Sequence, residues 1–385
     1  MSWKNNEIDF KNLRNHFGKK YPLLNEFEST NQDNEWHAEG DVAIHTDMVI
    51  KESLKIVNKD CPQYHDQMIL GALFHDIFKP VTTKEKELRG QQRIVSPRHE
   101  EDGYNHLFYK FKEDKELSGI ANEVLQIVGF HQTPKLLVVR DANKWQYLDA
   151  AIKFNTDLLY HFSRADILGR ESVDKSEQLD YIEMFKMQTE EYGFWGKDFN
   201  DPILECFSKN NVDRKDWGFL HQKAMYHLIK GDIYDPIEIL SKYYDEINHG
   251  YSQVFTMVGL SGSGKSSYIK DEFINCEIVS LDAIRDEFSK NRDRKYEGQV
   301  LQESKKRLTS HLAKKNDVVY DATNIRKDFR QRVLTHTINY NSYYKPILME
   351  TTLSECIEND KKRKFSIGEE LIRKQANNFQ HPIFD

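Results

Sequence analysis

Cysteines and long apolar runs are scarce in this chain. Its 385 residues include only four cysteines, which are widely scattered and form no C-x-x-C pair. This pattern argues against a disulfide framework and a thiolate zinc site, so a bound metal would need nitrogen and oxygen ligands. The longest apolar stretches, such as 254–260, are far shorter than the roughly 18–20 residues of a membrane span. The opening MSWKNN contains no apolar signal region, so we expect a cytoplasmic protein without membrane contact.

The chain does contain the apolar and charged residues of an ordinary folded protein. Its residues are 38% hydrophobic and 30% charged, and its formal net charge is -7. At roughly 100–200 residues per domain, the length predicts two domains or three. Residues 251–385 carry about 23 basic and about 19 acidic side chains, roughly +4, which leaves roughly −11 for the first 250. We expect the basic part to meet a polyanion, although each basic cluster alone is equally well explained as a solvated helix face.

The spacing of apolar residues changes character near residue 250. Between residues 41 and 244 apolar side chains recur every three or four positions, which predicts an all-α domain. The predicted helices span 43–58, 67–77, 103–111, 120–130, 145–168 and 178–192. After residue 254 short apolar runs at 254–258, 278–281, 318–320 and 346–349 alternate with helical segments, which predicts an α/β domain with a parallel sheet. The predicted domains are therefore 1–250 and 251–385.

A glycine-rich motif follows the first predicted strand. Residues 259–266, GLSGSGKS, fit the pattern G-x-x-x-x-G-K-[ST]. The glycines let backbone N–H groups converge on a β-phosphate, and the following helix N-terminus adds a favourable dipole. The predicted nucleotide-binding residues are Gly259, Ser261, Gly262, Ser263, Gly264, Lys265, Ser266 and Ser267, together with Arg363. Lys265 is expected to reach the β- and γ-phosphates of ATP or another nucleoside triphosphate, and Ser266 to offer its hydroxyl to Mg²⁺.

Two aspartates follow later strands of the predicted sheet, where ligands bind in parallel sheets. Asp282 has Arg285 three residues on, so both lie on one helical face. The carboxylate is placed to accept a proton from an attacking hydroxyl while the guanidinium holds an acceptor phosphate. The alternative is an N-cap aspartate beside a surface arginine. Asp321 is expected to order the magnesium shell or the P-loop serine, and Arg363, in the basic run 361–364, to stabilise the transferred phosphoryl group.

The second half of the chain resembles a known kinase module. It contains, in order, GLSGSGKSS, LDAIRDE, VVYDATN, a basic lid and a final NFQHP, a series similar to that of the polynucleotide 5′-kinase superfamily. The resemblance covers roughly residues 252–385 and implies that Lys265 and Ser266 are the P-loop pair. It further implies Asp282 as general base, Arg285 as the contact to the acceptor's phosphate and Arg363 as a lid arginine. The family's lid often has a second arginine where this chain has Asn359.

Histidine and aspartate recur in the apolar helices of the first half. His75 and Asp76 lie in LGALFHDIFKP, a mostly apolar segment that ends at a proline. A buried imidazole and carboxylate are unfavourable unless they are paired or ligated, and a divalent cation binds both. The candidate partners are His45, His99, His131 and Asp166. Each of these alone is more often a satisfied or exposed residue than a metal ligand.

Together these residues resemble the H…HD…H…H…D series of HD-domain metal-dependent phosphohydrolases. The segments WHAEGDVAIHT, FHDIFKP, PRHEEDG and RADILGR are similar to the HD module fused to CCA-adding tRNA nucleotidyltransferases, which acts on 2′,3′-cyclic and 2′-phosphates. The resemblance implies one metal ion held by His45, His75, Asp76 and Asp166. It implies a second at His99 and His131, with Asp76 bridging the two.

Such metal ions lower the pKa of bound water, polarise phosphoryl oxygens and orient an in-line attack. Mn²⁺, Ni²⁺, Co²⁺, Fe²⁺ and Zn²⁺ all suit histidine and aspartate ligands. Lys79 lies one helical turn from Asp76 and is expected to hold a phosphate during catalysis, with help from Arg164 and Arg170. His37 is either a substrate contact or a packed residue.

The two series in one chain resemble the bifunctional HD-Pnk enzymes of bacterial RNA repair. This resemblance implies that the HD pocket hydrolyses 2′,3′-cyclic phosphate or 2′-phosphate ends, while the P-loop site transfers the ATP γ-phosphate to a 5′-OH. The expected substrates are RNA termini, with DNA as an alternative, and a separate RNA ligase would act in trans. Three other readings stay open: a small-molecule P-loop kinase, an HD nucleotide phosphohydrolase, and a non-enzymatic nucleotide sensor.

Overall fold

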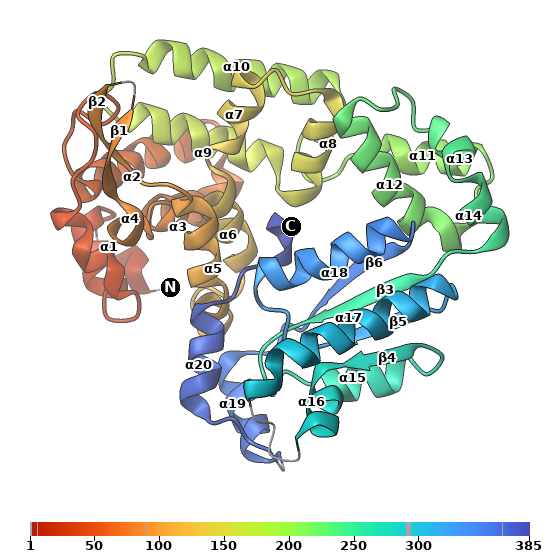
Figure 1. Cartoon of the computed structure of the whole chain (residues 1–385). Helices are drawn as coiled ribbons and strands as arrows, with labels where there is room; N and C mark the ends of the chain where they lie inside the picture. Colours follow the sequence, from red (N-terminus) through yellow and green to blue (C-terminus); the bar gives the residue numbers. More distant parts are fainter. Residues whose placement is uncertain (1, 6, 89, 290–293, 364) are drawn as a thin grey trace. The chain divides into compact units, whose positions relative to one another are not determined.

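The computed structural model describes residues 2–5, 7–88, 90–289, 294–363 and 365–385 (Figure 1). Lys364, in the predicted basic run, lies outside these ranges. The chain forms two compact units, Met1–Asn200 and Asp201–Asp385. The residues from 201 to 249 therefore pack with the second unit, and the functional boundary at residue 250 stays a prediction.

The first unit is helical, as its sequence predicts. Its α-helices are α1 (Phe10–Phe17), α2 (Val42–Lys59), α3 (His65–Phe74), α4 (Lys79–Thr82), α5 (His99–Glu113), α6 (Ala121–Phe130), α7 (Thr133–Val139), α8 (Lys144–Lys153), α9 (Thr156–Leu168) and α10 (Lys175–Glu191). Short 3-10 helices precede or join them: η1 (Ser2–Asn5), η2 (Pro22–Ser29) and η3 (Pro62–Tyr64). Helix α2 packs on α3 and α9, α5 packs on α6, and α10 packs on α7 and α9. The core between them is apolar because the inward positions of these helices are apolar.

The single helix predicted over 145–168 is wrong, because the structure has two helices there. Phe154 is extended, and the side chain of Asn155 accepts hydrogen bonds from the backbone N–H groups of Asp157 at 3.1 Å and Leu158 at 3.4 Å. Asparagine is a favoured N-cap, so Asn155 starts α9 as a new helix. The apolar spacing continues across the two-residue break, and for that reason the periodicity did not reveal it.

A β-hairpin that the sequence analysis missed interrupts the helical unit. Strands β1 (Lys84–Leu88) and β2 (Gln91–Val95) pair antiparallel, with Lys84 opposite Val95 and Leu88 opposite Gln91. Gly90, at the turn, has a φ of 80°, a conformation that glycine adopts without steric cost. The strands are mostly polar and exposed. Without alternating apolar residues they carry no strand signal.

The second unit has the predicted α/β fold. Its elements are α11 (Pro202–Lys209), η4 (Arg214–Asp216), α12 (Trp217–Lys230), α13 (Glu238–Lys242), α14 (Tyr244–His249), β3 (Gln253–Val258), α15 (Lys265–Glu272), β4 (Glu277–Ser280), α16 (Leu281–Phe288), η5 (Arg294–Tyr296), α17 (Glu297–Ala313), β5 (Val318–Asp321), α18 (Lys327–Asn339), β6 (Tyr343–Leu348), α19 (Leu353–Lys361), α20 (Glu369–Asn377) and η6 (Pro382–Phe384). The four strands form one parallel sheet in the order β4-β5-β3-β6 (Figure 1). All four predicted strands are confirmed to within a few residues.

Apolar side chains cover both faces of this sheet. On one face Val254 and Val318 pack with α16, α17 and α18, and on the other Met257 and Val319 pack with Ile269 of α15. A strand that is buried on both faces reads as a continuous apolar run, which explains the runs seen in the sequence. The parallel arrangement brings the carboxyl ends of β3, β4 and β5 to one edge, where ligands bind in such sheets.

Helix α12 links residues 201–249 to the sheet through hydrogen bonds and ring packing. The side-chain amide of Gln222 donates to the carbonyl oxygen of Tyr344 at 2.7 Å and accepts from its N–H at 3.1 Å. These two bonds satisfy backbone groups on the outer edge of β6, which would otherwise be open to pairing with another strand. The ring of Tyr251 also stacks on Phe219, with centroids 4.0 Å apart. The helices before residue 250 are therefore part of the second unit's packing.

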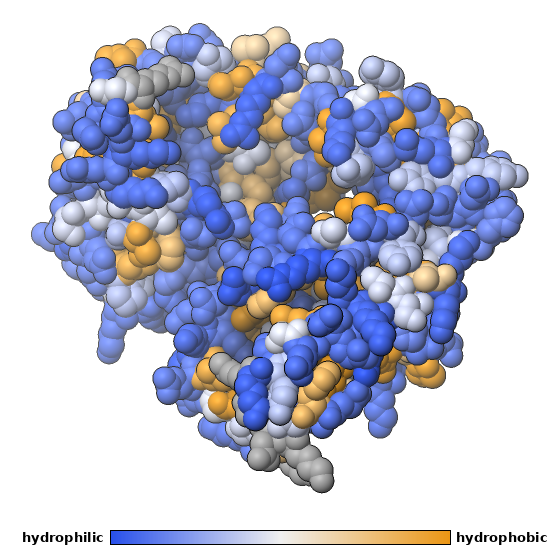
Figure 2. All heavy atoms as spheres, viewed as in Figure 1, coloured by the Kyte–Doolittle hydropathy of each residue, from blue (hydrophilic) through white to orange (hydrophobic). Residues whose placement is uncertain are grey.

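The surface carries no sign of a membrane-spanning segment in the part of the chain that the structure describes. None of its helices combines the length and the apolar character needed to cross a membrane. The face drawn in Figure 2 carries mostly hydrophilic side chains, with apolar ones in small groups. Large exposed apolar residues such as Val173 and Tyr234 lie in separate loops, as is ordinary for folded proteins.

Candidate functional site

Four histidines from four segments of the first unit meet in its interior. His45 lies in α2, His75 follows α3, His99 begins α5 and His131 follows α6. All four are at most 8% exposed. Each of them lies in the first turn of a helix or directly after a helix end. The structure thus brings together the histidines that the sequence singled out.

Each of these rings donates its Nδ1–H group to a backbone carbonyl. The acceptors are Gly169 for His45 at 3.1 Å, Ala72 for His75 at 2.9 Å, Ser96 for His99 at 2.7 Å, and Ile127 and Val128 for His131, both at 3.2 Å. A carbonyl can only accept, so Nδ1 must carry the proton and the lone pair of the neutral ring lies on Nε2. The backbone therefore holds all four rings with Nε2 available as a ligand.

Two buried carboxylates lie among the four Nε2 atoms. Asp166 Oδ1 is 3.1 Å from His45 Nε2. Asp76 has Oδ2 at 3.1 Å from His75 Nε2 and Oδ1 at 3.2 Å from His99 Nε2. The two oxygens of Asp76 thus face different histidines, which is the arrangement expected of a bridging carboxylate.

The donor atoms fit two divalent cations. Three sets of three residues have ligand atoms within 4.8 Å of one another. Two of them lie at the cluster, His45 with His75 and Asp76, and Asp76 with His99 and His131; the third joins His37, Glu39 and His45. The buried atoms Asp76 Oδ1, Asp166 Oδ1, His99 Nε2 and His131 Nε2 have no hydrogen bond of ordinary geometry to any described residue. Buried polar atoms without such partners are rare in folded proteins, and metal coordination accounts for them. Nitrogen and oxygen donors of this kind suit first-row transition metals.

The electrostatics of the cluster favour bound cations. Burial alone would raise the pKa of Asp76, but its neighbours His75, Lys79 and His99 lower it well below its usual range. Asp76 is therefore ionised although it is fully buried. Burial, together with the charges of His75 and His99, lowers the pKa of His131 to about 4. His131 is consequently neutral at pH 7 and keeps its Nε2 lone pair.

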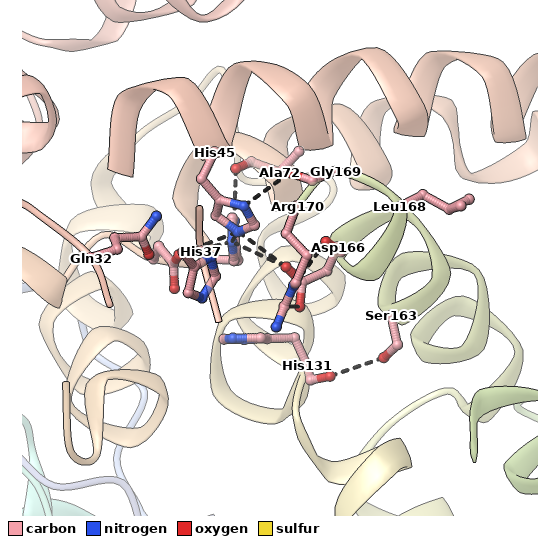
Figure 3. Close-up of polar contacts among 12 residues, drawn as sticks. Gln32, His37, His45, Ala72, His131, Ser163, Asp166, Leu168, Gly169 and Arg170 are labelled. Carbon is pink, nitrogen blue, oxygen red and sulfur yellow. Dashed lines mark hydrogen bonds and ion pairs between the residues drawn. The ribbon is translucent and has the colours of Figure 1, made fainter. Parts of the chain in front are cut away.

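Two cationic side chains accompany the carboxylates. Lys79 Nζ lies 2.7 Å from Asp76 Oδ2 and donates to Gln32 Oε1 at 2.6 Å. Arg170 donates through Nη2 to Asp166 Oδ2, and its side chain is 6% exposed (Figure 3). The structure therefore places Lys79 and Arg170 at the cluster.

Arg164, the third cation considered from the sequence, does not join them. Its nearest carboxylates are Asp60 at 3.6 Å and Glu183 at 3.5 Å, and its guanidinium lies over the ring of Tyr160. Arg170, which follows the C-cap of α9, instead lies at the cluster and pairs with Asp166. The different directions of these two arginines on one segment decide which of them reaches the metal ligands.

Sequence reasoning missed Glu39, which supports the cluster from outside. Its Oε1 lies 3.1 Å from His45 Nδ1 and 2.8 Å from His37 Nδ1, and its Oε2 accepts the backbone N–H of Glu171 at 2.9 Å. The side chain is 1% exposed. A carboxylate on the far nitrogen of a ligand histidine fixes the ring and raises its basicity. Glu39 lies in the segment WHAEGD, but a single glutamate there gave no reason to expect burial.

The P-loop lies at the carboxyl end of β3 and leads into α15. Gly262 and Gly264 have φ values of 82° and 86°, in the region that favours glycine. A Cβ atom on Gly262 would lie 2.1 Å from the carbonyl oxygen of Cys356. Both glycines are therefore required by the loop's conformation, as the motif predicts.

Lys265 is folded into this loop. Its Nζ donates to the carbonyl oxygens of Gly259 at 3.0 Å and Leu260 at 2.7 Å. Burial lowers its pKa to about 8, although the charge of Asp321 opposes the shift. A triphosphate bound to the loop offers stronger, charged acceptors than these carbonyls. Ser266 and Ser267 lie in the exposed first turn of α15.

The predicted acceptor residues lie at the same edge of the sheet. Asp282, in the first turn of α16, accepts from Arg285 Nη1 at 2.7 Å. The N-cap of α16 is Ser280, so the alternative reading of Asp282 as an N-cap is wrong. Ser280 also donates to Asp321 Oδ2 at 3.0 Å, at the end of β5. Glu297, which the sequence did not point to, binds Arg285 through both carboxylate oxygens at 3.1 and 2.7 Å.

The segment from α19 to α20 contacts the P-loop. Arg363 Nη1 lies 3.4 Å from Asp360 Oδ1. Asn359, at the position of the family's second lid arginine, donates to the carbonyl oxygen of Gly262 at 3.1 Å. Gln375 accepts from the N–H of Ser261 at 2.9 Å and donates to its Oγ at 3.1 Å. Polar side chains of this C-terminal segment thus hold the loop that cradles the phosphates.

The first unit therefore carries a histidine–aspartate cluster that fits metal ions, and the second carries a P-loop. Comparison with protein families agrees with both sites: residues 44–151 match the HD domain, and residues 254–382 match the AAA domain. The chain carries an HD domain followed by an AAA domain of the P-loop kinase-like type. HD domains bind divalent metal ions, and P-loop kinases use ATP with Mg²⁺. The two matches support an enzyme with phosphohydrolase and kinase activity.

Proposed function

We propose that this protein heals the ends of broken RNA, using the HD site on the 3′ side of a break and the P-loop site on the 5′ side. The observation that supports it best is the presence in one chain of a histidine–aspartate cluster around Asp76 and a P-loop with Asp282 and Arg285 at the same sheet edge. The excess of basic residues in the stretch 251–385 also suits a polyanionic substrate.

In the HD site the protein's own residues hold the metal ions and balance their charge. The ligands are His45, His75, Asp76 and Asp166 for one ion, and Asp76, His99 and His131 for the other. Bound divalent ions would supply a hydroxide near neutral pH and polarise the phosphoryl oxygens. Lys79 and Arg170 add positive charge where the anionic substrate arrives. We expect hydrolysis of 2′,3′-cyclic phosphate and 2′-phosphate ends.

In the P-loop site the residues divide the work of phosphoryl transfer. Backbone N–H groups of residues 259–265 hold the β-phosphate, Lys265 neutralises the β- and γ-phosphates, and Ser266 offers a hydroxyl to Mg²⁺. Asp282 accepts the proton of the attacking 5′-OH. Arg285 binds the phosphate next to that hydroxyl, and Arg363 stabilises charge on the transferred group. Sealing of the healed ends is left to a separate RNA ligase.

One assay tests both halves. An RNA labelled at both ends, with a 5′-OH and a 2′,3′-cyclic phosphate, is incubated with the full-length protein, ATP and one divalent metal at a time from Mn²⁺, Ni²⁺, Co²⁺, Fe²⁺ and Zn²⁺. We expect a 5′-phosphate and a 3′ end without phosphate. Parallel reactions contain a DNA oligonucleotide, mononucleotides or a panel of small hydroxyl acceptors. Turnover of these alone would replace the proposal with a small-molecule kinase fused to a nucleotide phosphohydrolase.

A further inference from the structure

A small cavity adjoins the metal cluster in the first unit. Its lining includes two cluster members, His131 and Asp166, and two cations, Lys135 and Arg170. Its volume is about 10 Å³, which is room for about one water-sized group. The cavity is therefore too small for a base or a sugar, and its natural occupant is a single oxygen atom of a group bound at the cluster.

The two cations differ in their partners: Arg170 is paired with Asp166 but has further N–H donors, whereas Lys135 has only a weak, neutral partner. Arg170 uses Nε and one Nη2 hydrogen on Asp166, so three of its five N–H donors have no acceptor among the described residues. Lys135, on α7, has one hydrogen-bond partner in the described structure, the neutral Oε1 of Gln178 on α10, at the long distance of 3.4 Å. Lys135 forms no ion pair with a described carboxylate, although the charges of Asp166, Asp174 and Glu100 act on it from a greater distance. Burial and the charge of Arg170 lower the pKa of Lys135.

A pair of nearby, partly desolvated cations is unfavourable by itself and favourable around an anion. Two like charges repel more strongly in a protein interior than in water, because the dielectric constant is lower. The same conditions strengthen hydrogen bonds from Lys135 and Arg170 to an ionised oxygen. Since His131 and Asp166 belong both to the cavity and to the cluster, an oxygen in the cavity belongs to the group that the metal ions hold.

We propose that Lys135 and Arg170 form an oxyanion subsite that binds one nonbridging oxygen of the reacting phosphoryl group and favours phosphomonoesters over cyclic phosphodiesters. The inference rests on the proposed phosphohydrolase function of the HD site. A monoester dianion has a second ionised oxygen to place in the cavity while another faces the metal ions. A diester carries one negative charge, so the subsite adds less to its binding. Lys135 is thus a specificity residue for the 2′-phosphate step.

The test compares the full-length protein with Lys135→Met, Lys135→Arg and the matched control Lys153→Met. Lys153 is a lysine of α8 that pairs with Asp149. Each variant is loaded with the same divalent metal, and its metal content and thermal midpoint are measured. The substrates are p-nitrophenyl phosphate, a monoester, and bis(p-nitrophenyl) phosphate, a diester. Binding of inorganic phosphate is followed by calorimetry as a readout separate from turnover.

We expect Lys135→Met to lower kcat/KM for the monoester about tenfold or more, the loss typical of one charge-assisted hydrogen bond. The kcat/KM for the diester should change less than about threefold, and the affinity for inorganic phosphate should fall together with the monoester activity. Lys135→Met should keep the metal content of the wild type. Lys135→Arg and Lys153→Met should keep its monoester activity and phosphate affinity. Equal losses on both substrates, or unchanged phosphate affinity, would overturn the subsite.

A second variant keeps the test informative if Lys135→Met does not fold. Gln178→Glu places a carboxylate beside Lys135 and neutralises it without removing a buried side chain, so we expect the same selective loss of monoester activity. Failure of the RNA repair proposal is distinguishable, because it appears as a wild-type protein that leaves 2′-phosphate and cyclic phosphate RNA ends intact. In that outcome phosphate binding and the two model substrates still test the subsite.

Discussion

Glu39 holds His45 from the side of the imidazole that faces away from the metal cluster, with 3.1 Å between Oε1 and Nδ1. The opposite nitrogen of the same ring, Nε2, lies 3.1 Å from Asp166 Oδ1. The glutamate therefore helps to orient a predicted metal ligand from the side away from the cluster. Such outer contacts fix ligand histidines and raise their basicity.

Glu39→Gln should weaken metal binding at the HD site by about 10- to 100-fold, because the amide orients the His45 ring less firmly and does not raise its basicity. Metal titration of the full-length protein by calorimetry measures the effect. Glu85→Gln, on the exposed strand β1, is the matched control and should bind metal normally. ATP binding should not change in either variant, and wild-type metal affinity in Glu39→Gln would show that the contact has no such role.

Asp76→Ala and Asp282→Ala should separate the two activities. Asp76 supplies an oxygen to each of the two predicted metal sites, so its loss should abolish processing of 2′,3′-cyclic phosphate ends and spare phosphate transfer to a 5′-OH. Asp282→Ala should do the reverse, because no base then takes the proton of the attacking hydroxyl. Both reactions are followed on the doubly labelled RNA. Loss of both activities in one folded variant would contradict two independent sites.

Gly262→Ala should abolish ATP binding and leave the HD site active. An alanine Cβ there would lie 2.1 Å from a backbone oxygen of Cys356, and φ is 82°, so the loop must shift at a strain of roughly 1–3 kcal/mol. Binding of a fluorescent ATP analogue measures the change. Gly298→Ala is the control, since a Cβ there meets nothing within 4 Å and alanine favours the helix by up to about 1 kcal/mol. Normal ATP affinity in Gly262→Ala would refute the required conformation.

Lys223→Met should stabilise the second unit at neutral pH. Lys223 is 6% exposed, its ammonium lies over the rings of Phe219 and Tyr243, and burial lowers its pKa to about 8. Between about pH 8 and the usual lysine value near 10.5 the unfolded chain binds a proton that the folded chain does not, so the wild type gains stability as pH rises through this interval. Below pH 8 the buried, charged Lys223 lowers the free energy of unfolding by its full amount, on the order of 1 kcal/mol after the favourable ring contacts are counted.

Denaturant unfolding at pH 7 and pH 10 tests this expectation. The free energy of unfolding of Lys223→Met should exceed that of the wild type at pH 7, and the difference should shrink at pH 10. Lys209→Met, at the exposed end of α11, should show no comparable pH dependence. A difference that grows with pH would have the wrong sign and would contradict the lowered pKa.

Much of the fold was predictable because its signals are local. The strands β3, β4, β5 and β6 were recognised from short apolar runs, since a parallel strand buried on both faces must be apolar along its length. The helices of the first unit followed from apolar residues three and four apart. The break between α8 and α9 was not predicted, because a single capping residue, Asn155, decides it while the apolar spacing continues.

The central residues of the candidate sites were predictable from the sequence, but the polar residues around them were not. GLSGSGKS was recognised because the conformation of a phosphate loop demands glycine at set positions, as Gly262 and Gly264 show. The metal ligands were recognised because histidine and aspartate in apolar helices need a partner. Glu39, Lys135, Glu297 and Gln375 were missed, since charged and amide side chains of this kind are usually exposed and their sequence neighbourhoods do not mark them as buried.

The sequence by itself determined the two domain types and the candidate site residues, because loop conformation, strand burial and ligand chemistry each restrict the residue at a given position. Only the tertiary structure decided which polar groups surround those residues. Glu39 meets the backbone of Glu171 across 132 positions, and Ser261 meets Gln375 across 114. Contacts over such separations depend on how helices and loops pack, and no periodicity or local motif records them.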